Sequence, residues 1–495
     1  MTKSSFSLMV LVLALGLRCC AFDFSDVRQK AEELGSKPYV PYSNSVPDSL
    51  LKMDYGQHQA IRFKSERALW KAESLPFRVE FFHPGYLQRE TVSINEIVGG
   101  ASRLLPAGPS FYDYGKADLN LPPNLGHAGF RIISSTDGFG EVAVFLGASY
   151  FRMLGKQQSF GVSGRGLAIG TGAPEGEEFP VFREFWLPRP EPLDKQVQVL
   201  ALMDSPSVAG AYRFTITPGA ETVALVDATL YPRVVKQTYG IAPLTSMFLH
   251  GKNGRTQNTD FRPEVHDSDG LLIHNGRDEW IWHSLEAGRM LRINAFSDEN
   301  PRGFGLIQRE RRFDEYQDLV AHFEKRPSVW VLPRGAWGKG SVQLVQIPSD
   351  REFQDNIVAF WVPESAPKPG VPLSLEYELH WTKEDHFNRE LGQVRATRIG
   401  RVVVDPPKNP ANLRFVIDFG GAAVESLSNR EILTAEVTYG KDVKFVADSV
   451  YKNEVDQTWR LVIEIADPGK AADLTALLKY HDRPITETWT YTWQP

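Results

Sequence analysis

Short segments in which hydrophobic and polar residues alternate recur along most of the chain. Such segments, rich in Val, Ile, Phe and Tyr and bounded by Gly, Pro, Asp or Ser, are typical of strands that bury one face. Clear examples lie at 77–85, 131–135, 141–154, 197–205, 211–219, 222–233 and 341–348. The 40 glycines and 33 prolines are spread between these segments, as many tight turns require. The pattern predicts an all-β protein built as a sandwich or a barrel.

Helical periodicity is clear only at residues 25–34 (SDVRQKAEEL). Weaker helical patterns lie at 58–72, 313–323 and 471–480. We therefore expect helices to be few and to lie outside the main sheets.

A polar, strongly charged stretch near residue 390 divides the chain. We predict a large β-sandwich domain over 22–385, a linker or cleft-covering loop over 386–401, and a second domain over 402–495. The last part contains six or seven strand-like segments, which is the length and spacing of an immunoglobulin-like sandwich without its cysteine pair. The loop would cover a cleft of its own chain or of the partner in a homodimer.

The first 21 residues have the pattern of a secretory signal peptide. Lys3 precedes an apolar run from Phe6 to Leu17, and small residues lead to a predicted cleavage after Ala21. The run is shorter than the roughly 20 residues that span a membrane, so we expect export without stable membrane insertion. The two cysteines of the chain lie inside this segment, which excludes disulfides and cysteine metal sites in the mature protein.

The charge of the chain narrows the class of ligand. With 55 basic and 61 acidic side chains, the formal net charge is −6, which argues against nucleic acid or an anionic membrane surface as a partner. A neutral or weakly charged ligand fits better. A hydrophobic content of 42% is sufficient for a large core without disulfides.

Motifs of cofactor and metal chemistry are incomplete. The segment 333–341 lacks the leading glycine and the Ser or Thr of a phosphate loop, and 164–170 is one residue too long for a dinucleotide fingerprint. The stretch 161–165 misses the G-x-S-x-G elbow of serine hydrolases. His266, His274 and His283 lack metal-ligand spacing and are interpreted as structural. The sequence therefore predicts no cofactor and no metal.

Residues 266–355 are rich in carboxylates and aromatic rings, a mixture that suits a sugar cleft. The alternative for Trp280, Trp330 and Trp361 is the sandwich core, because large rings are usually buried there. Trp337, flanked by glycine and basic residues, is a better candidate for stacking on a sugar. On spacing alone, residues such as Asp267 and Asp355 are more often turn residues than catalysts.

Eight strings in the same order resemble the periplasmic glucan biosynthesis proteins of types G and D. They are LGASYFR (146–152), SGRGLAI (163–169), GEEFPVFREFW (176–186), APLTSMFL (242–249), RPEVHDSDGL (262–271), EWIW (279–282), NPRGFGLIQR (300–309) and WGKGSVQL (337–344). The resemblance covers essentially the whole mature chain. It implies a galactose-mutarotase-like β-sandwich followed by an immunoglobulin-like domain, export to the periplasm, and action on osmoregulated glucans with a β-1,2-linked glucose backbone.

The resemblance also implies roles for single residues, because family members are similar to inverting β-1,2-glucan hydrolases and to relatives that transfer sugars. By this resemblance, the segment QDNI (354–357) contains the general acid, Asp355, and the segment HDS (266–268) contains the proposed base, Asp267. In inverting enzymes the two carboxyl groups are typically ~6.5–9.5 Å apart. Trp337, Arg326 and Glu352 are the candidates for binding the sugar, and Glu352 would also lie near the acid. We expect partial burial against Phe353 or Phe360, or the negative charge of a nearby carboxylate such as Glu352, to raise the pKa of the acid. A non-catalytic protein that carries nascent glucan is the second hypothesis.

Overall fold

The structure is a computed structural model of the chain. It describes residues 21–41, 46–115, 119–136, 138–236, 238–253, 260–385, 387–388, 390–403 and 411–494. The predicted signal peptide, except for Ala21, lies outside these residues. Within the described ranges, no helix is long and apolar enough to cross a membrane.

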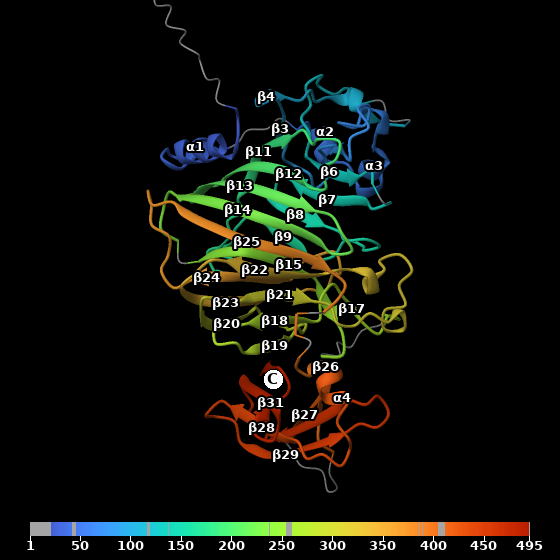
Figure 1. Ribbon diagram of the computed structural model, residues 1–495, viewed down its shortest axis with the longest axis vertical. Helices are drawn as coiled ribbons and strands as arrows, with labels where there is room; N and C mark the ends of the chain where they lie inside the picture. The colour runs from blue at the N-terminus through green and yellow to red at the C-terminus, as the bar shows by residue number, and fades with distance from the viewer. Residues whose placement is uncertain are drawn as a thin grey trace, which may run out of the picture.

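Sheets dominate the fold, which confirms the predicted all-β class (Figure 1). A ten-stranded sheet has the order β2 (Phe77–Phe82), β6 (Gly129–Ser134), β7 (Gly140–Leu146), β8 (Tyr150–Met153), β9 (Ser163–Arg165), β15 (Tyr239–Ser246), β24 (Ile357–Pro363), β23 (Lys339–Gln346) and β20 (Arg292–Glu299), with β10 (Ala168–Ile169) paired to β15. Two small pairs flank it, β1 (Arg62–Phe63) with β5 (Tyr112–Asp113) and β16 (Phe248–His250) with β17 (Val265–His266).

A fifteen-stranded sheet forms the second layer and continues into the C-terminal part. Its order is β28 (Thr434–Tyr439), β31 (Ala472–Tyr480), β33 (Thr488–Trp493), β19 (Trp280–Ser284), β18 (Gly270–His274), β21 (Gly303–Ile307), β22 (Ser328–Arg334), β25 (Leu373–Thr382), β14 (Thr222–Pro232), β13 (Val208–Thr217), β12 (Val197–Asp204), β11 (Val181–Pro188), β3 (Ser93–Val98) and β4 (Ala101–Leu104), with β32 (Arg483–Pro484) on β31. A four-stranded sheet, β26 (Gln393–Arg401), β27 (Leu413–Gly420), β30 (Trp459–Ile465) and β29 (Phe445–Lys452), completes the C-terminal sandwich.

The two large sheets enclose one aromatic-rich core. Phe145 and Phe151 of the ten-stranded sheet meet Phe214 of β13 with ring centroids 5.1 and 4.9 Å apart. All three rings are essentially inaccessible to solvent. Burial of a large apolar side chain is worth about 2–3 kcal/mol, so this layer contributes strongly to stability.

Helices are short and peripheral. The predicted helix at 25–34 is α1 (Phe24–Gly35), which begins at an Asp23 capping box and packs on β12 and β13. The other helices are α2 (Asp48–Leu51), α3 (Tyr55–Ala60) and α4 (Ala422–Glu425), with single 3-10 turns at Ser65–Arg67, Pro109–Phe111, Phe313–Glu315 and Phe323–Lys325.

The three weaker helix predictions are wrong in most of their length. In the 58–72 region the helix ends at Ala60, and 313–323 contains only a 3-10 turn and irregular backbone. Residues 472–480 form strand β31, with Leu474, Ala476 and Leu478 buried at a period of two.

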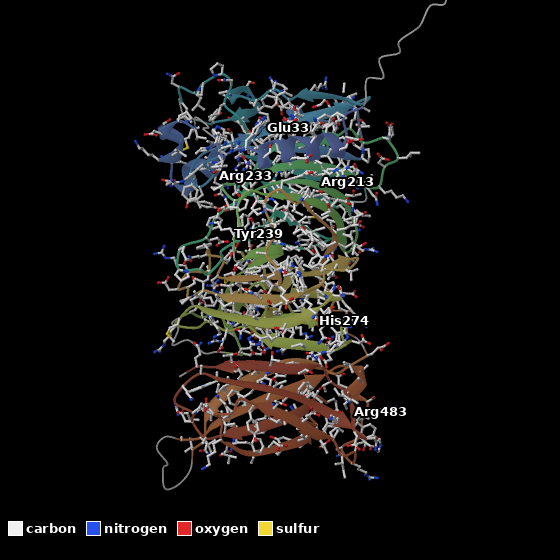
Figure 2. All side chains as sticks on the ribbon, turned by 90° about the vertical axis from the view of Figure 1, so that its left-hand side faces the viewer. Glu33, Arg213, Arg233, Tyr239, His274 and Arg483 are labelled. Carbon is white, nitrogen blue, oxygen red and sulfur yellow. The ribbon has the colours of Figure 1, made fainter. Side chains whose placement is uncertain are left out.

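The C-terminal sandwich is joined to the large one without a break in the sheet. Strand β33 pairs in parallel with β19, with Trp489 opposite Trp282. Trp282 and Trp330, which precede the predicted boundary, belong to the same apolar core as the C-terminal strands. In Figures 1 and 2 the C-terminal layer lies at one end of the long axis, next to the layer that carries His274. The division into two domains and the immunoglobulin-like likeness stay predictions.

The predicted linker or loop at 386–401 is wrong for residues 393–401, which form β26. Val394 and Thr397 of this strand are buried, and a register irregularity between Val394 and Ala396 interrupts the alternation that would have revealed it. Phe387, just before the strand, stacks on Trp330 with ring centroids 4.8 Å apart. The described residues of this segment are therefore part of the junction between the sandwiches.

Candidate functional site

A polar row crosses the face of the ten-stranded sheet that points away from the core. Strand side chains alternate between faces, so Phe151 of β8 faces the core, and Tyr150 and Arg152 face outward. On β9, Arg165 pairs with Tyr150, and the Ser163 hydroxyl accepts a hydrogen bond from Nε of Arg152 at 2.6 Å. Two short strands thus place four polar side chains next to β15 and β24.

Asp355 lies two residues before β24 and is held by its neighbour Asn356. The backbone N–H of Asn356 donates to the carbonyl of Ser246 at 3.0 Å. Its side-chain amide donates to the carbonyls of Phe248 and Ile347 at 3.0 and 3.1 Å, and its Oδ1 accepts from the N–H of Phe248 at 2.8 Å. Asn356 is buried. These bonds attach the loop of Asp355 to the segment 246–248.

Asp267 follows β17 and is attached to the same segment. Its backbone N–H donates to the carbonyl of Met247 at 2.8 Å, and the hydroxyl of the next residue, Ser268, lies 2.5 Å from that of Ser246. Two aspartates 88 positions apart in the sequence therefore converge on one short stretch of β15 and its extension. The structure brings together the two residues that the sequence resemblance singled out.

The two carboxyl groups have different electrostatic surroundings. Asp267 is buried and forms an ion pair with Arg326, whose guanidinium lies 4.1 Å from the ring centre of Phe323. Burial is the largest cause that raises the pKa of Asp355, the charge of Asp267 raises it further, and the guanidinium of Arg152 opposes both. Oδ2 of Asp355 lies 3.9 Å from Nη2 of Arg152, a looser contact than the one at Asp267. The net effect is a raised pKa, which favours the protonated form of Asp355.

Arg165 is a buried cation at the edge of this site that the sequence analysis did not select. It forms an ion pair with Glu177 at 2.7 Å, and its guanidinium lies over the rings of Tyr150 and Phe179, 5.2 and 5.0 Å from their centres. Its positive charge also lowers the pKa of Asp355. Arg165 and Glu177 lie inside two of the strings that carry the family resemblance, and this position was the only indication in the sequence of a role for them.

Glu352 and the neighbouring aromatic residue do not surround Asp355 as expected. The carboxylate of Glu352 is 2.5 Å from Nη2 of Arg262, which also binds Asp260 and Asp318 at 2.6 and 2.8 Å. Through Arg262, Glu352 thus connects the loop of Asp355 to the segment 260–262 and to the segment that contains Asp318. The side chain of Phe353 is 94% exposed, so it cannot supply the burial that raises the pKa of Asp355.

Trp337 lies at the other end of β23 from Asp355. Trp337 lies two residues before Lys339, the first residue of β23. Asp355 lies two residues before Ile357, and Ile357 pairs with Gln346, the last residue of β23. Eight residues of strand span roughly 25 Å. The Trp337 ring packs beside Trp361 and Tyr377, with centroids 6.3 and 6.0 Å away. The structure therefore does not bring Trp337 together with the two aspartates.

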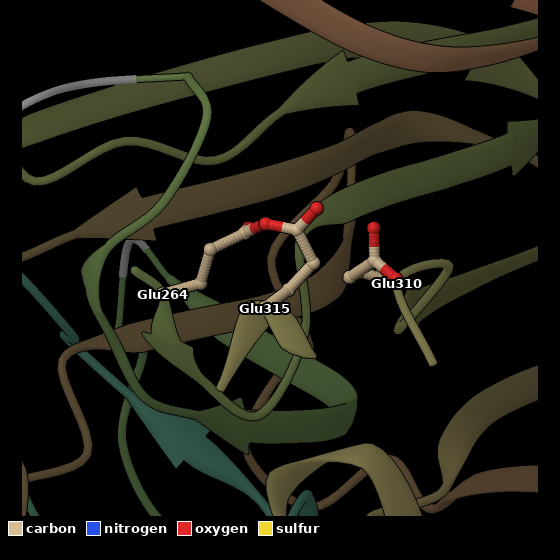
Figure 3. Close-up of side chains that lie close together, drawn as sticks. All are labelled: Glu264, Glu310 and Glu315. Atoms are coloured by element: carbon tan, nitrogen blue, oxygen red, sulfur yellow. The ribbon is translucent and has the colours of Figure 1, made fainter. Parts of the chain in front are cut away.

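Three glutamates, Glu264, Glu310 and Glu315, offer oxygens within 4.8 Å of one another (Figure 3). The ammonium of Lys252 lies among them, 3.1 Å from Glu264 and 3.6 Å from Glu315, and is ion-paired with Glu310. Burial opposes ionisation of Glu264, but hydrogen bonds and charges of His266 and Lys252 lower its pKa to about 2. These carboxylates are arranged to bind a lysine, and we assign them a structural role.

The histidines considered as metal ligands have protein partners. His266 lies between Glu264 and Gln308 at 2.8 and 2.9 Å, His274 contacts Asp278 at 2.7 Å, and His283 contacts the Thr490 hydroxyl at 2.9 Å. The three lie in β17, β18 and β19 and serve packing and hydrogen bonding there.

Comparison with known proteins gives matches over nearly the whole chain. Residues 22–493 match the family described as "Periplasmic glucan biosynthesis protein, MdoG". The chain is 41% identical over 491 residues to glucans biosynthesis protein G of Pseudomonas paraeruginosa, covering 95% of this chain and 92% of that protein. It is 43% identical over 493 residues to glucans biosynthesis protein D 1 of Ralstonia nicotianae, covering 96% and 92%.

Proposed function

Because the chain belongs to the MdoG family of periplasmic glucan biosynthesis proteins, we propose that it remodels the β-1,2-glucan backbone of osmoregulated glucans in the periplasm. In this proposal residues 1–21 direct export, and the exported protein is an inverting endo-acting glycoside hydrolase or a transglycosylase. The convergence of Asp355 and Asp267 on the segment 246–248 is the observation that carries the proposal.

The proposed mechanism assigns opposite roles to the two carboxyl groups. Asp355, whose pKa is raised chiefly by burial, protonates the glycosidic oxygen as the sugar leaves. Asp267 accepts the proton of the attacking nucleophile on the opposite face of the sugar ring, directly or through an intervening hydroxyl. Water as the nucleophile gives hydrolysis, whereas a sugar hydroxyl gives transfer. Asp267 forms an ion pair with Arg326, which holds this carboxylate in place.

The same ion pair also favours a second function. Since Asp267 is buried against Arg326, its role could be structural, and Asp355 would then only bind sugar hydroxyls. The protein would in that case carry or present nascent glucan without cleaving it.

Incubation with linear β-1,2-glucan separates the two functions. We expect the wild-type protein to release reducing ends or to shift the polymer size, and Asp355→Asn to lower the rate by about 10²–10⁴. Asp350→Asn is the matched control, because this aspartate lies in the same loop with its side chain 93% exposed. Equal inactivity of wild type and Asp355→Asn, with both still binding glucan, would refute catalysis and support the carrier function.

A further inference from the structure

A hollow lies on the same outward face of the ten-stranded sheet, and β8 and β9 separate its strands from β15. It has a volume of about 570 Å³ and is lined by residues of β2, β6 and β7 and of the segment that includes α3 and β1. In Figure 1, α3 lies beside β6 and β7 at this end of the molecule. Its lining includes Phe63, Phe82, His83, Gln88 and Tyr112.

Strand register joins this hollow to the site. Val144 of β7, which lines the hollow, pairs with Arg152 of β8, and Arg152 is the residue that contacts Asp355. On the other side Val144 pairs with Arg131, which pairs with Glu80 of β2. Adjacent strands are about 4.8 Å apart, so the hollow begins next to Arg152 and extends roughly 14 Å away from it. The two features share one continuous face.

The chemistry of the lining fits an uncharged ligand with both ring-stacking and hydrogen-bonding surfaces. Burial lowers the pKa of His83 and of the adjacent His127 to about 4, and burial raises the pKa of Tyr112, so all three are neutral near pH 7. Nδ1 of His83 is buried and forms no hydrogen bond within the described part of the chain. Of the two arginines in the lining, Arg131 is compensated by Glu80 at 2.7 Å, and Arg62 is exposed to solvent at the rim. Rings combined with neutral polar groups suit a sugar better than an ion.

We propose that this hollow is a remote subsite for the glucan whose scissile bond lies at Asp355, so that affinity depends on chain length. The inference rests on the proposed function, since it takes the ligand to be the same polysaccharide. A chain long enough to reach both places gains contacts with Phe82 and Gln88, whereas a disaccharide held at Asp355 cannot reach them.

The test compares a long linear β-1,2-glucan with the β-1,2-linked disaccharide, by calorimetric titration and by competition. All proteins carry Asp355→Asn, so that binding is measured without turnover. Phe82→Ser and, separately, Gln88→Ala remove lining groups, and thermal unfolding verifies the fold of each. Phe82 is only half-buried, and the Gln88 side chain lies outside the core clusters, so Gln88→Ala keeps the test valid if Phe82→Ser fails to fold.

We expect Phe82→Ser to weaken binding of the long glucan about three- to tenfold and to leave binding of the disaccharide unchanged. Lys339→Ala is the matched control, because Lys339 lines a separate 890 Å³ cavity where β20 and β24 end and β23 begins. Unchanged affinity of both lining variants for the long glucan would overturn the inference, as would equal weakening for both ligands. If the parent protein binds neither ligand, the proposed function fails and the inference with it.

Discussion

Nη2 of Arg152 lies 3.9 Å from Oδ2 of Asp355, close enough to influence the charge of this carboxyl group and too far for a direct hydrogen bond. Asp267, in contrast, is in direct contact with Arg326. Because the contact with Arg152 is loose, burial is the dominant influence on the pKa of Asp355. Burial raises this pKa. The raised pKa favours the protonated form of Asp355, which is the form that a general acid needs.

Replacing Arg152 should move the pH dependence of activity. The guanidinium favours the ionised form of Asp355, so its removal in Arg152→Gln should raise the pKa of that carboxyl further. An acid with a higher pKa stays protonated to higher pH, and the alkaline limb of the kcat/KM profile should move upward. Arg351→Gln, in an arginine whose side chain is 79% exposed in the same loop, should leave the limb in place. A shift to lower pH in Arg152→Gln would contradict the assignment.

The ion pair between Arg326 and Asp267 should be visible in a double-mutant cycle. Arg326→Met leaves a buried carboxylate without its partner, which should lower the free energy of unfolding by about 3 kcal/mol. Adding Asp267→Asn removes the uncompensated charge, so the double variant should recover part of this loss. Urea unfolding of the four proteins measures the coupling. Strictly additive effects would show that the pair contributes no interaction energy.

Asn356 is a positioning residue, because it holds the Asp355 loop without being placed to react. Asn356→Ala leaves the N–H of Phe248 and the carbonyls of Phe248 and Ile347 without partners and should cost about 2–4 kcal/mol. The displaced loop should lower kcat more than it changes KM. Stability comes from urea unfolding at 25 °C, and the kinetic split comes from initial rates over a range of glucan concentrations. Unchanged kcat in a folded Asn356→Ala protein would exclude a positioning role.

The shared core at the junction should make the N-terminal part dependent on the C-terminal strands. A chain ending at residue 390 loses the parallel pairing of β33 with β19 and uncovers Trp282 and Trp330. We expect this fragment to aggregate or to unfold at a markedly lower temperature than the full chain, as gel filtration and calorimetry would show. A monomeric fragment with the unfolding temperature of the full protein would instead support two independent domains.

The incorrect prediction of a helix at 471–480 shows that strand pairing in the tertiary structure can override a local sequence pattern. Ala, Leu and Lys favour a helix in isolation, and the segment is rich in them. In the structure, β31 pairs with both β28 and β33, and Leu474, Ala476 and Leu478 are buried on one face. Backbone pairing along both edges of the strand and burial of one face outweigh the intrinsic helix preference, which is worth a few tenths of a kcal/mol per residue.

The prediction of a linker at 393–401 is wrong for a related reason. Arg395 and Arg398 made it look solvated, yet Val394 and Thr397 are buried in the C-terminal sandwich. Whether alternate positions of a polar strand are buried depends on what the rest of the chain places against them, which a local pattern does not contain.

The alternation of apolar and polar residues was enough to determine the all-β class and most of the strands, because each strand signals its buried face locally. Resemblance of short strings was enough to single out Asp267 and Asp355. Only the tertiary structure decided that both attach to the segment 246–248, that Arg152 and Arg165 lie beside them, and that Trp337 lies apart. These relationships arise from pairing between strands far apart in the chain, and such pairing is set by the packing of the whole sheet.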